Sequence, residues 1–125
     1  MKLKPTNSEL EILTILWKKG ERTVRDVNEE LSGDKEVEVG YTTTLKLMQI
    51  MHEKGLVERD TSSRTHVYKA LVSQVKTSQN LLDTMIDTVF NGSAAQLVMQ
   101  ALSNKKSSKE EIEMIRKYID ELEKR

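Results

Sequence analysis

The sequence predicts a mainly α-helical protein with a small β-hairpin. Three observations support this fold class. Three capped amphipathic segments come first, two short segments of alternating apolar and polar residues follow, and the second half shows helical periodicity without a strand pattern. Within residues 1–71, three helices are followed by a hairpin, which is the order of elements in a winged helix-turn-helix domain. Residues 72–125 are predicted to form a separate helical segment.

Each of the first two helices is predicted from a capping residue, an apolar stripe and a glycine. Thr6 followed by Glu9 has the spacing of a capping box, and Gly20 ends the helical pattern. Thr23 is placed to cap the second helix, which Gly33 ends. The residues expected to face inward are Leu10, Leu13, Leu16 and Trp17 in the first helix, and Val24, Val27 and Leu31 in the second.

The third helix is predicted at residues 41–54, after a polar, irregular stretch at residues 34–40 that indicates a loop. Gly55 closes this helix. Two strands are then expected at residues 56–60 and 66–70, joined by a polar turn. The inner face of the third helix is expected to consist of Thr44, Leu47, Met48 and Met51.

The second half of the chain is predicted to form three more helices, at residues 71–92, 93–103 and 107–125. Each has an apolar stripe, yet three such helices make a poor independent core. We therefore interpret residues 72–125 as a helical dimerisation segment covered by a second copy of the chain. An antiparallel bundle within one chain is the alternative. The positions expected in the dimer interface are Leu82, Val89, Leu97, Val98, Leu102, Ile112, Ile115, Ile119 and Leu122.

The composition excludes several classes of protein. Among its 125 residues the chain has 20 basic and 20 acidic residues, so no overall positive charge indicates nucleic-acid binding. Disulfides and thiolate metal sites are excluded because there is no cysteine. The N-terminal stretch lacks the apolar run of a signal peptide, and nothing approaches the roughly 20 apolar residues that span a bilayer. We expect a cytoplasmic protein with no membrane insertion and no cofactor.

The titratable residues do not form a catalytic pattern. The histidines, His52 and His66, have no cysteine and no acidic cluster beside them that would complete a metal site. No Ser-His-Asp grouping and no glycine-rich phosphate loop is present. His52 is interpreted as a surface or packing residue, and the chain is not expected to be an enzyme.

The start of the third helix carries a row of hydroxyl side chains. Threonine is an indifferent helix former, but at the N-terminus of a recognition helix it can bond phosphates and base edges. The free N–H groups and the positive dipole end of the helix would assist it. The alternative is ordinary helix capping by Thr42 or Thr43. The candidate DNA-contacting residues of this helix are Tyr41, Thr42, Thr43, Lys46 and Gln49.

The charge distribution favours this interpretation. Residues 41–70 contain five basic and three acidic residues, whereas residues 20–40 contain three basic and seven acidic residues. Arg64, in the turn between the strands, is placed where a wing tip would hold a cation over phosphates, although a solvated turn arginine is the alternative. His66, which opens the second strand, is a candidate phosphate neighbour.

Four stretches of the chain together carry a family resemblance. They read "YTTTLKLMQIMHEKGLVERD", "THVYKA", "NGSAAQLVMQAL" and "EEIEMIRKYIDELE". They resemble the BlaI/MecI/CopY family of bacterial repressors, and the resemblance extends from about Leu10 to Leu122. It implies an N-terminal winged-helix domain, a C-terminal segment that dimerises, and repression through binding to an inverted-repeat operator in double-stranded DNA.

The resemblance also implies two modes of induction. In the β-lactam-responsive branch, a membrane sensor-protease system triggers cleavage of the repressor between an asparagine and a phenylalanine. The matching positions here are Gln100 and Ala101, so the cleavage signal differs. The copper-responsive branch binds metal through a cysteine cluster, which this chain lacks.

The function expected from the sequence is a dimeric DNA-binding transcriptional repressor in a resistance circuit of the β-lactam type. The alternative is a winged-helix protein-interaction module, which the balanced net charge would suit. Salt-dependent binding to duplex DNA distinguishes the two.

Overall fold

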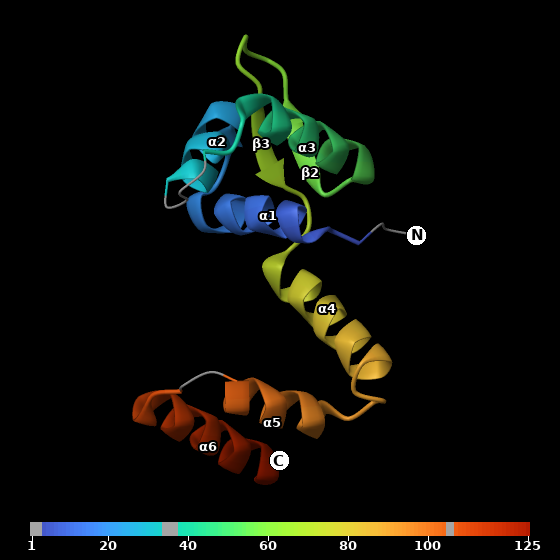
Figure 1. Ribbon diagram of the computed structural model, residues 1–125, viewed down its shortest axis with the longest axis vertical. Helices are drawn as coiled ribbons and strands as arrows, with labels where there is room; N and C mark the ends of the chain where they lie inside the picture. Colours follow the sequence, from blue (N-terminus) through green and yellow to red (C-terminus); the bar gives the residue numbers. More distant parts are fainter. Residues whose placement is uncertain (1–3, 34–37, 105–106) are drawn as a thin grey trace. The chain divides into compact units, whose positions relative to one another are not determined.

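A computed structural model describes residues 4–33, 38–104 and 107–125 of the chain (Figure 1). The loop predicted at residues 34–40 therefore falls partly outside the described residues, at 34–37. In chain order the elements are α1 (Asn7–Lys19), β1 (Arg22–Thr23), α2 (Val24–Ser32), α3 (Tyr41–Lys54), β2 (Val57–Asp60), β3 (Val67–Ala70), α4 (Gln74–Thr88), α5 (Ala94–Asn104) and α6 (Lys109–Glu123).

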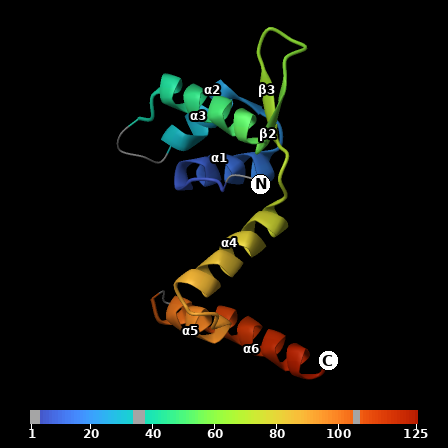
Figure 2. The ribbon, with the colours of Figure 1, turned by 90° about the vertical axis from the view of Figure 1, so that its right-hand side faces the viewer.

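The chain divides into two compact units, Met1–Gln79 and Asn80–Arg125. The domain boundary expected after residue 71 stays a prediction. In the first unit, α1, α2 and α3 precede the β2–β3 hairpin, and the tip of the hairpin projects beyond the helices in both views (Figures 1 and 2). The predicted fold class, mainly α with a small antiparallel β element, is confirmed.

The sheet contains a third strand that the sequence did not predict. Strand β3 lies between β1 and β2, and both pairings are antiparallel. In the β1–β3 pair, Arg22 lies opposite Tyr68 and Thr23 lies opposite Val67. The predicted hairpin of β2 and β3 is present, and the short connection between α1 and α2 adds a third strand to it. This connection fastens the start of α2 to the hairpin.

The capping predictions for α1 and α2 are confirmed. The Thr6 hydroxyl oxygen accepts a hydrogen bond from the Glu9 N–H (3.2 Å), and Glu9 Oε1 accepts one from the Thr6 N–H (2.8 Å). Thr23 and Asp26 form the same capping box at the start of α2. Gly55 ends α3 at φ 80°, in the left-handed region that favours glycine.

The core of the first unit is formed by side chains from α1, α2, α3 and the sheet. Its buried apolar members are Ile12, Leu13, Leu16, Val24, Val27, Met48, Met51, Leu56, Val57 and Tyr68. Ile12 is fully buried, although the sequence did not single it out. The predicted inward residues that lie only partly buried at the edge are Leu10, Trp17, Leu31 and Leu47. The Trp17 indole N–H donates to the Val72 carbonyl (2.9 Å), which holds the chain after β3 against α1.

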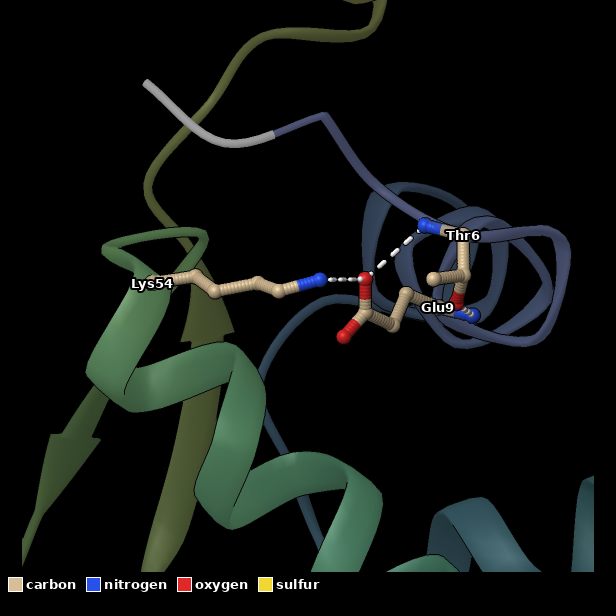
Figure 3. Close-up of polar contacts among 3 residues, drawn as sticks. All are labelled: Thr6, Glu9 and Lys54. Carbon is tan, nitrogen blue, oxygen red and sulfur yellow. Dashed lines mark hydrogen bonds and ion pairs between the residues drawn. The ribbon is translucent and has the colours of Figure 1, made fainter. Parts of the chain in front are cut away.

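One charged side chain belongs to this interior. Glu9 is only 1% exposed, and its Oε1 accepts from both the Thr6 N–H and the Lys54 ammonium, the latter at 2.7 Å (Figure 3). Lys54 is the last residue of α3 and lies mostly inside as well. A single carboxylate oxygen therefore joins the first turn of α1 to the last turn of α3. The sequence predicted Glu9 only as a member of the capping box.

The second unit has helices without a core. No described residue of Asn80–Arg125 is buried, and the apolar side chains of α5 and α6 are exposed or half-buried. Ser93 and Ser108 cap these two helices, each accepting from the N–H three residues later. None of the described helices is long and apolar enough to cross a membrane.

Helix α4 is shorter than its sequence pattern predicted. The Ser73 hydroxyl oxygen accepts a hydrogen bond from the Lys76 N–H, so Ser73 caps the helix and the first helical residue is Gln74. Its end comes at Thr88, before Asn91 and Gly92, which both have positive φ. The Gly92 N–H reaches back to the Ile86 carbonyl (2.8 Å) and closes the last turn.

Candidate nucleic-acid interface

The start of α3 differs from the starts of the other described helices. Gly40 is its N-cap, and no side chain makes a capping hydrogen bond there. Thr42 and Thr43 lie after the N-cap and are exposed, and the helix start has no side-chain capping hydrogen bond of the kind that the alternative interpretation required. The residues that cap the other described helices are Thr6, Thr23, Ser73, Ser93 and Ser108. Helix α3 thus presents unpaired N–H groups beside two free hydroxyls.

The third hydroxyl of the row has a structural role. Thr44 is fully buried, and its Oγ1 accepts a hydrogen bond from the Asn28 side-chain amide at 3.0 Å. The same Asn28 nitrogen donates to the Val39 carbonyl (2.8 Å), and the Val39 N–H donates to the Ser32 hydroxyl oxygen (3.2 Å). Asn28 and Ser32 of α2 therefore fix the chain as it enters α3. No local pattern in the sequence indicates this role of Asn28, because its partners lie 11 and 16 residues away.

The exposed face of α3 continues from its threonines. Lys46 and Gln49 are exposed; Lys46 lies four residues after Thr42 and Gln49 lies three residues after Lys46, so they share one face of the helix. Ile50, at 36% exposure, lies on the same face. Because Thr44, Met48 and Met51 bury the opposite side, this face points away from the core of the unit.

A surface depression of about 310 Å³ lies where α2, α3 and the hairpin meet. Three of the predicted DNA-contacting residues, Tyr41, Arg64 and His66, line it together. Arg25, from the first turn of α2, completes this group, and its guanidinium carbon lies 6.0 Å from the centre of the Tyr41 ring. The remaining lining residues are Thr23, Val24, Leu45, Thr65 and Tyr68. The sequence did not single out Arg25, because nothing along the chain indicates that α2 and the wing converge.

The wing, which is the hairpin of β2 and β3 with the turn between them, is stabilised by contacts within the hairpin. Lys69 and Glu58 form a cross-strand ion pair (3.2 Å). The Asp60 carboxylate accepts from the Ser62 N–H (2.9 Å) at the start of the turn. That backbone hydrogen bond, together with the Ser62 hydroxyl and the Lys69 charge, lowers the pKa of Asp60. These contacts fix the base of the turn, while Arg64 at its tip remains exposed.

The residues expected in the dimer interface lie on α4, α5, α6 and the turn after α4. Leu97 and Ile115 are half-buried within the chain. The exposed positions are Leu82, Val89, Val98, Leu102, Ile112, Ile119 and Leu122. Gln100 and Ala101, the expected cleavage residues, are both exposed in α5. Among the residues that the structure describes, no group of histidine and acidic side chains could hold a metal ion.

This fold, with an uncapped, hydroxyl-rich helix start beside a hairpin that carries Arg64, is the arrangement of a winged-helix DNA-binding domain. The chain belongs to the penicillinase repressor family, whose model matches residues 5–121. This family consists of transcriptional repressors, and the expectation that this chain is not an enzyme stays a prediction.

Curated relatives match over most of their length. The methicillin resistance regulatory protein MecI of Staphylococcus aureus (strain N315) is 23% identical over 115 residues, which are 92% of each protein. The penicillinase repressor of Staphylococcus aureus is 20% identical over 118 residues, covering 94% of this chain and 92% of the relative. Among solved structures, RosR of H. salinarum matches with a TM-score of 0.52 at 19% identity, over 93% of this chain and 91% of that one, and supports the fold.

Proposed function

We propose that this repressor acts as a homodimer that binds a pseudo-palindromic operator, with α3 in the major groove and the wing on the flanking backbone. The observation that carries the proposal is the open start of α3. There the helix leaves its N–H groups and the hydroxyls of Thr42 and Thr43 free to meet DNA. A helix optimised only for stability would have a side-chain cap and better helix formers at these positions.

Each proposed contact has a chemical reason. Thr42 and Thr43 bond phosphates or base edges, and Gln49 pairs with adenine. Lys46 reaches guanine or a phosphate from the same face. Tyr41, Arg64 and His66 contact the DNA backbone from the depression that they line together.

The exposed apolar side chains of the second unit support the homodimer. Helices α5 and α6 bury no described residue in the single chain and carry several exposed large apolar side chains, which a second copy of the chain could cover. The residues named above for this interface lie in α4 to α6 and the turn after α4. Pairing two copies would also place two winged helices on one duplex, as a two-fold symmetric operator requires.

The test of DNA binding uses the DNA upstream of the chain's own gene. Fluorescence anisotropy and footprinting with the purified full-length protein should reveal one protected inverted repeat, with half-sites about one helical turn or a multiple of it apart. Lys46→Ala should cost about 1–3 kcal/mol of operator binding if Lys46 reads a base. Lys19→Ala is the matched control, since Lys19 is an exposed cation of α1. Binding that is absent, or that does not depend on salt, would instead favour a protein-interaction module.

We also propose that cleavage between Gln100 and Ala101 relieves repression. Two observations support this step: membership of the penicillinase repressor family, and the exposure of both residues in α5. Cleavage there would detach α6 with Ile112, Ile115 and Ile119, and so remove most of the interface without touching α3. The DNA-binding unit would persist as a weakly binding monomer.

The test of cleavage is mass spectrometry of the protein from its native host before and during exposure to a β-lactam. The expected result is a fragment that ends at Gln100 and accumulates as the target gene is derepressed. Full derepression with the chain intact would exclude proteolysis as the signal. Cleavage at another bond in α5 would support the same mechanism but would place the cleavage site at other residues.

A further inference from the structure

The depression between α2, α3 and the wing has a chemical character that two other depressions on the first unit lack. A hollow of about 280 Å³ is lined by Asp26, Glu29 and Glu30, and one of about 400 Å³ by Glu21, Glu58 and Asp60, among other residues. No acidic residue lines the depression of Tyr41, which holds two arginines and a histidine. The depression lined by Tyr41 should therefore attract an anion.

The two arginines are available to such an anion. Within the described part of the chain, neither Arg25 nor Arg64 forms an ion pair with an acidic side chain. Asp26, the acid next to Arg25 in sequence, points its carboxylate to the Thr23 N–H (3.3 Å) and lines a different depression. The positive charges are thus not neutralised by their neighbours.

The geometry also orients Arg25. Its guanidinium carbon lies 6.0 Å from the centre of the Tyr41 ring, at the range of a cation–π contact, and this contact does not use the N–H donors of the guanidinium. The donors remain free to form the paired hydrogen bonds by which arginine binds phosphate oxygens. Arg64 and His66 approach the same space from the hairpin and supply further N–H donors.

We propose that Arg25, Tyr41 and Arg64 form one binding site for a single phosphate of the DNA backbone, with His66 as an additional donor. The proposal rests on the proposed function and extends it in two ways. It adds Arg25 of α2 to the interface, and it makes α2, α3 and the wing hold one phosphate jointly. Arg25 then fixes the position of α3 along the duplex and reads no base.

The experiment is a double-mutant cycle on Arg25 and Arg64 in the full-length protein. Affinity for a labelled mixed-sequence duplex and for the upstream DNA is measured by anisotropy over a range of NaCl concentrations. Arg25→Gln and Arg64→Gln should each weaken binding about tenfold on both duplexes. Each should also reduce the slope of log K against log salt by about one for each protomer, and so by about two for the dimer, because one phosphate contact is lost at each half-site.

The double variant decides whether the site is shared. Because the two arginines hold the same phosphate, the double variant should bind about as weakly as either single variant. Its salt slope should likewise fall by about one for each protomer, and so by about two for the dimer. Independent contacts would instead give about a hundredfold loss and a slope change of about two for each protomer, and so about four for the dimer, which would overturn the shared site.

Three controls separate the possible failures. Arg22→Gln removes the same charge from a depression lined by acids, and it should leave affinity and slope unchanged. Thermal unfolding of all variants should match the parent, since Arg25 and Arg64 are exposed.

If the parent binds DNA and Lys46→Ala weakens that binding while Arg25→Gln does not, the phosphate site is wrong and the proposed function stands. If the parent shows no salt-dependent binding, the proposed function itself fails.

Discussion

The two units of this chain differ in how far their apolar side chains are buried. Among the described residues of Met1–Gln79, ten apolar side chains are buried, and the carboxylate of Glu9 is enclosed with its partner Lys54. In Asn80–Arg125 no described residue is buried, although α5 and α6 are capped and amphipathic. The first unit has the features of a domain that folds within one chain, whereas the second has helices whose apolar faces need a cover. The stability of the second unit should therefore depend on protein concentration.

The largest expected effect comes from a charge placed on the uncovered face. Ile115→Asp would put an unpaired carboxylate into the proposed interface, where desolvation without a partner is costly. The variant should sediment as a monomer. Its operator affinity should fall by about 10²–10⁴-fold, because the second half-site no longer binds as part of one linked molecule. The first unit should keep its unfolding transition.

Met114→Asp is the matched control for this experiment. Met114 also lies on α6 and is 71% exposed, but it lies off the stripe that contains Ile115. The control should remain a dimer with operator affinity close to that of the parent. A monomeric Met114→Asp, or a dimeric Ile115→Asp, would place the interface on a different face of α6.

A smaller effect, on the free energy of unfolding, is expected when one leucine in each unit is replaced by alanine. Leu13 is fully buried, so Leu13→Ala should lower the free energy of unfolding by about 2–5 kcal/mol, independently of protein concentration. Leu82 is 46% exposed in the single chain, so Leu82→Ala should act only through the dimer. Urea unfolding at several protein concentrations measures both. If the loss from Leu82→Ala did not change with concentration, an intrachain contact would have to cover Leu82.

The sequence predicted best the features that depend on neighbouring residues. The capping box at Thr6 and the cap at Thr23 depend only on residues three positions apart, and both are present as expected. The end of α3 at Gly55 and the hairpin after it follow from equally local signals. The first-unit fold could therefore be predicted almost completely.

Features that depend on contacts between distant segments were missed. Strand β1 has two residues, too few for any alternation to appear in sequence. The contacts of Asn28 with Thr44 and of Arg25 with Tyr41 join residues 16 positions apart, and periodicity carries no information about them. The candidate site was therefore predicted as residues of α3 and the wing, without the α2 residues that support them.

The smallest of the three effects concerns the buried charge of the first unit, and it tests whether that unit is self-sufficient. Glu9→Gln keeps an oxygen for the Thr6 N–H but removes the negative charge that faces the Lys54 ammonium at 2.7 Å. The expected loss is about 1–3 kcal/mol, the range for hydrogen bonds to charged groups. Partial exposure of Lys54 moderates this loss, because water can still reach its ammonium group.

Two further variants make this last prediction specific. Lys54→Met should destabilise more than Glu9→Gln, because it leaves the carboxylate of Glu9 enclosed with only one N–H donor. Glu30→Gln breaks the exposed pair with Lys19 and should cost at most about 1 kcal/mol, with a stronger dependence on salt. Urea unfolding at two salt and two protein concentrations measures all three. If the Glu9 and Lys54 variants match the parent, the pair does not hold α3 against α1. If their losses change with protein concentration, the first unit also depends on the dimer, and the difference between the two units is smaller than their burial indicates.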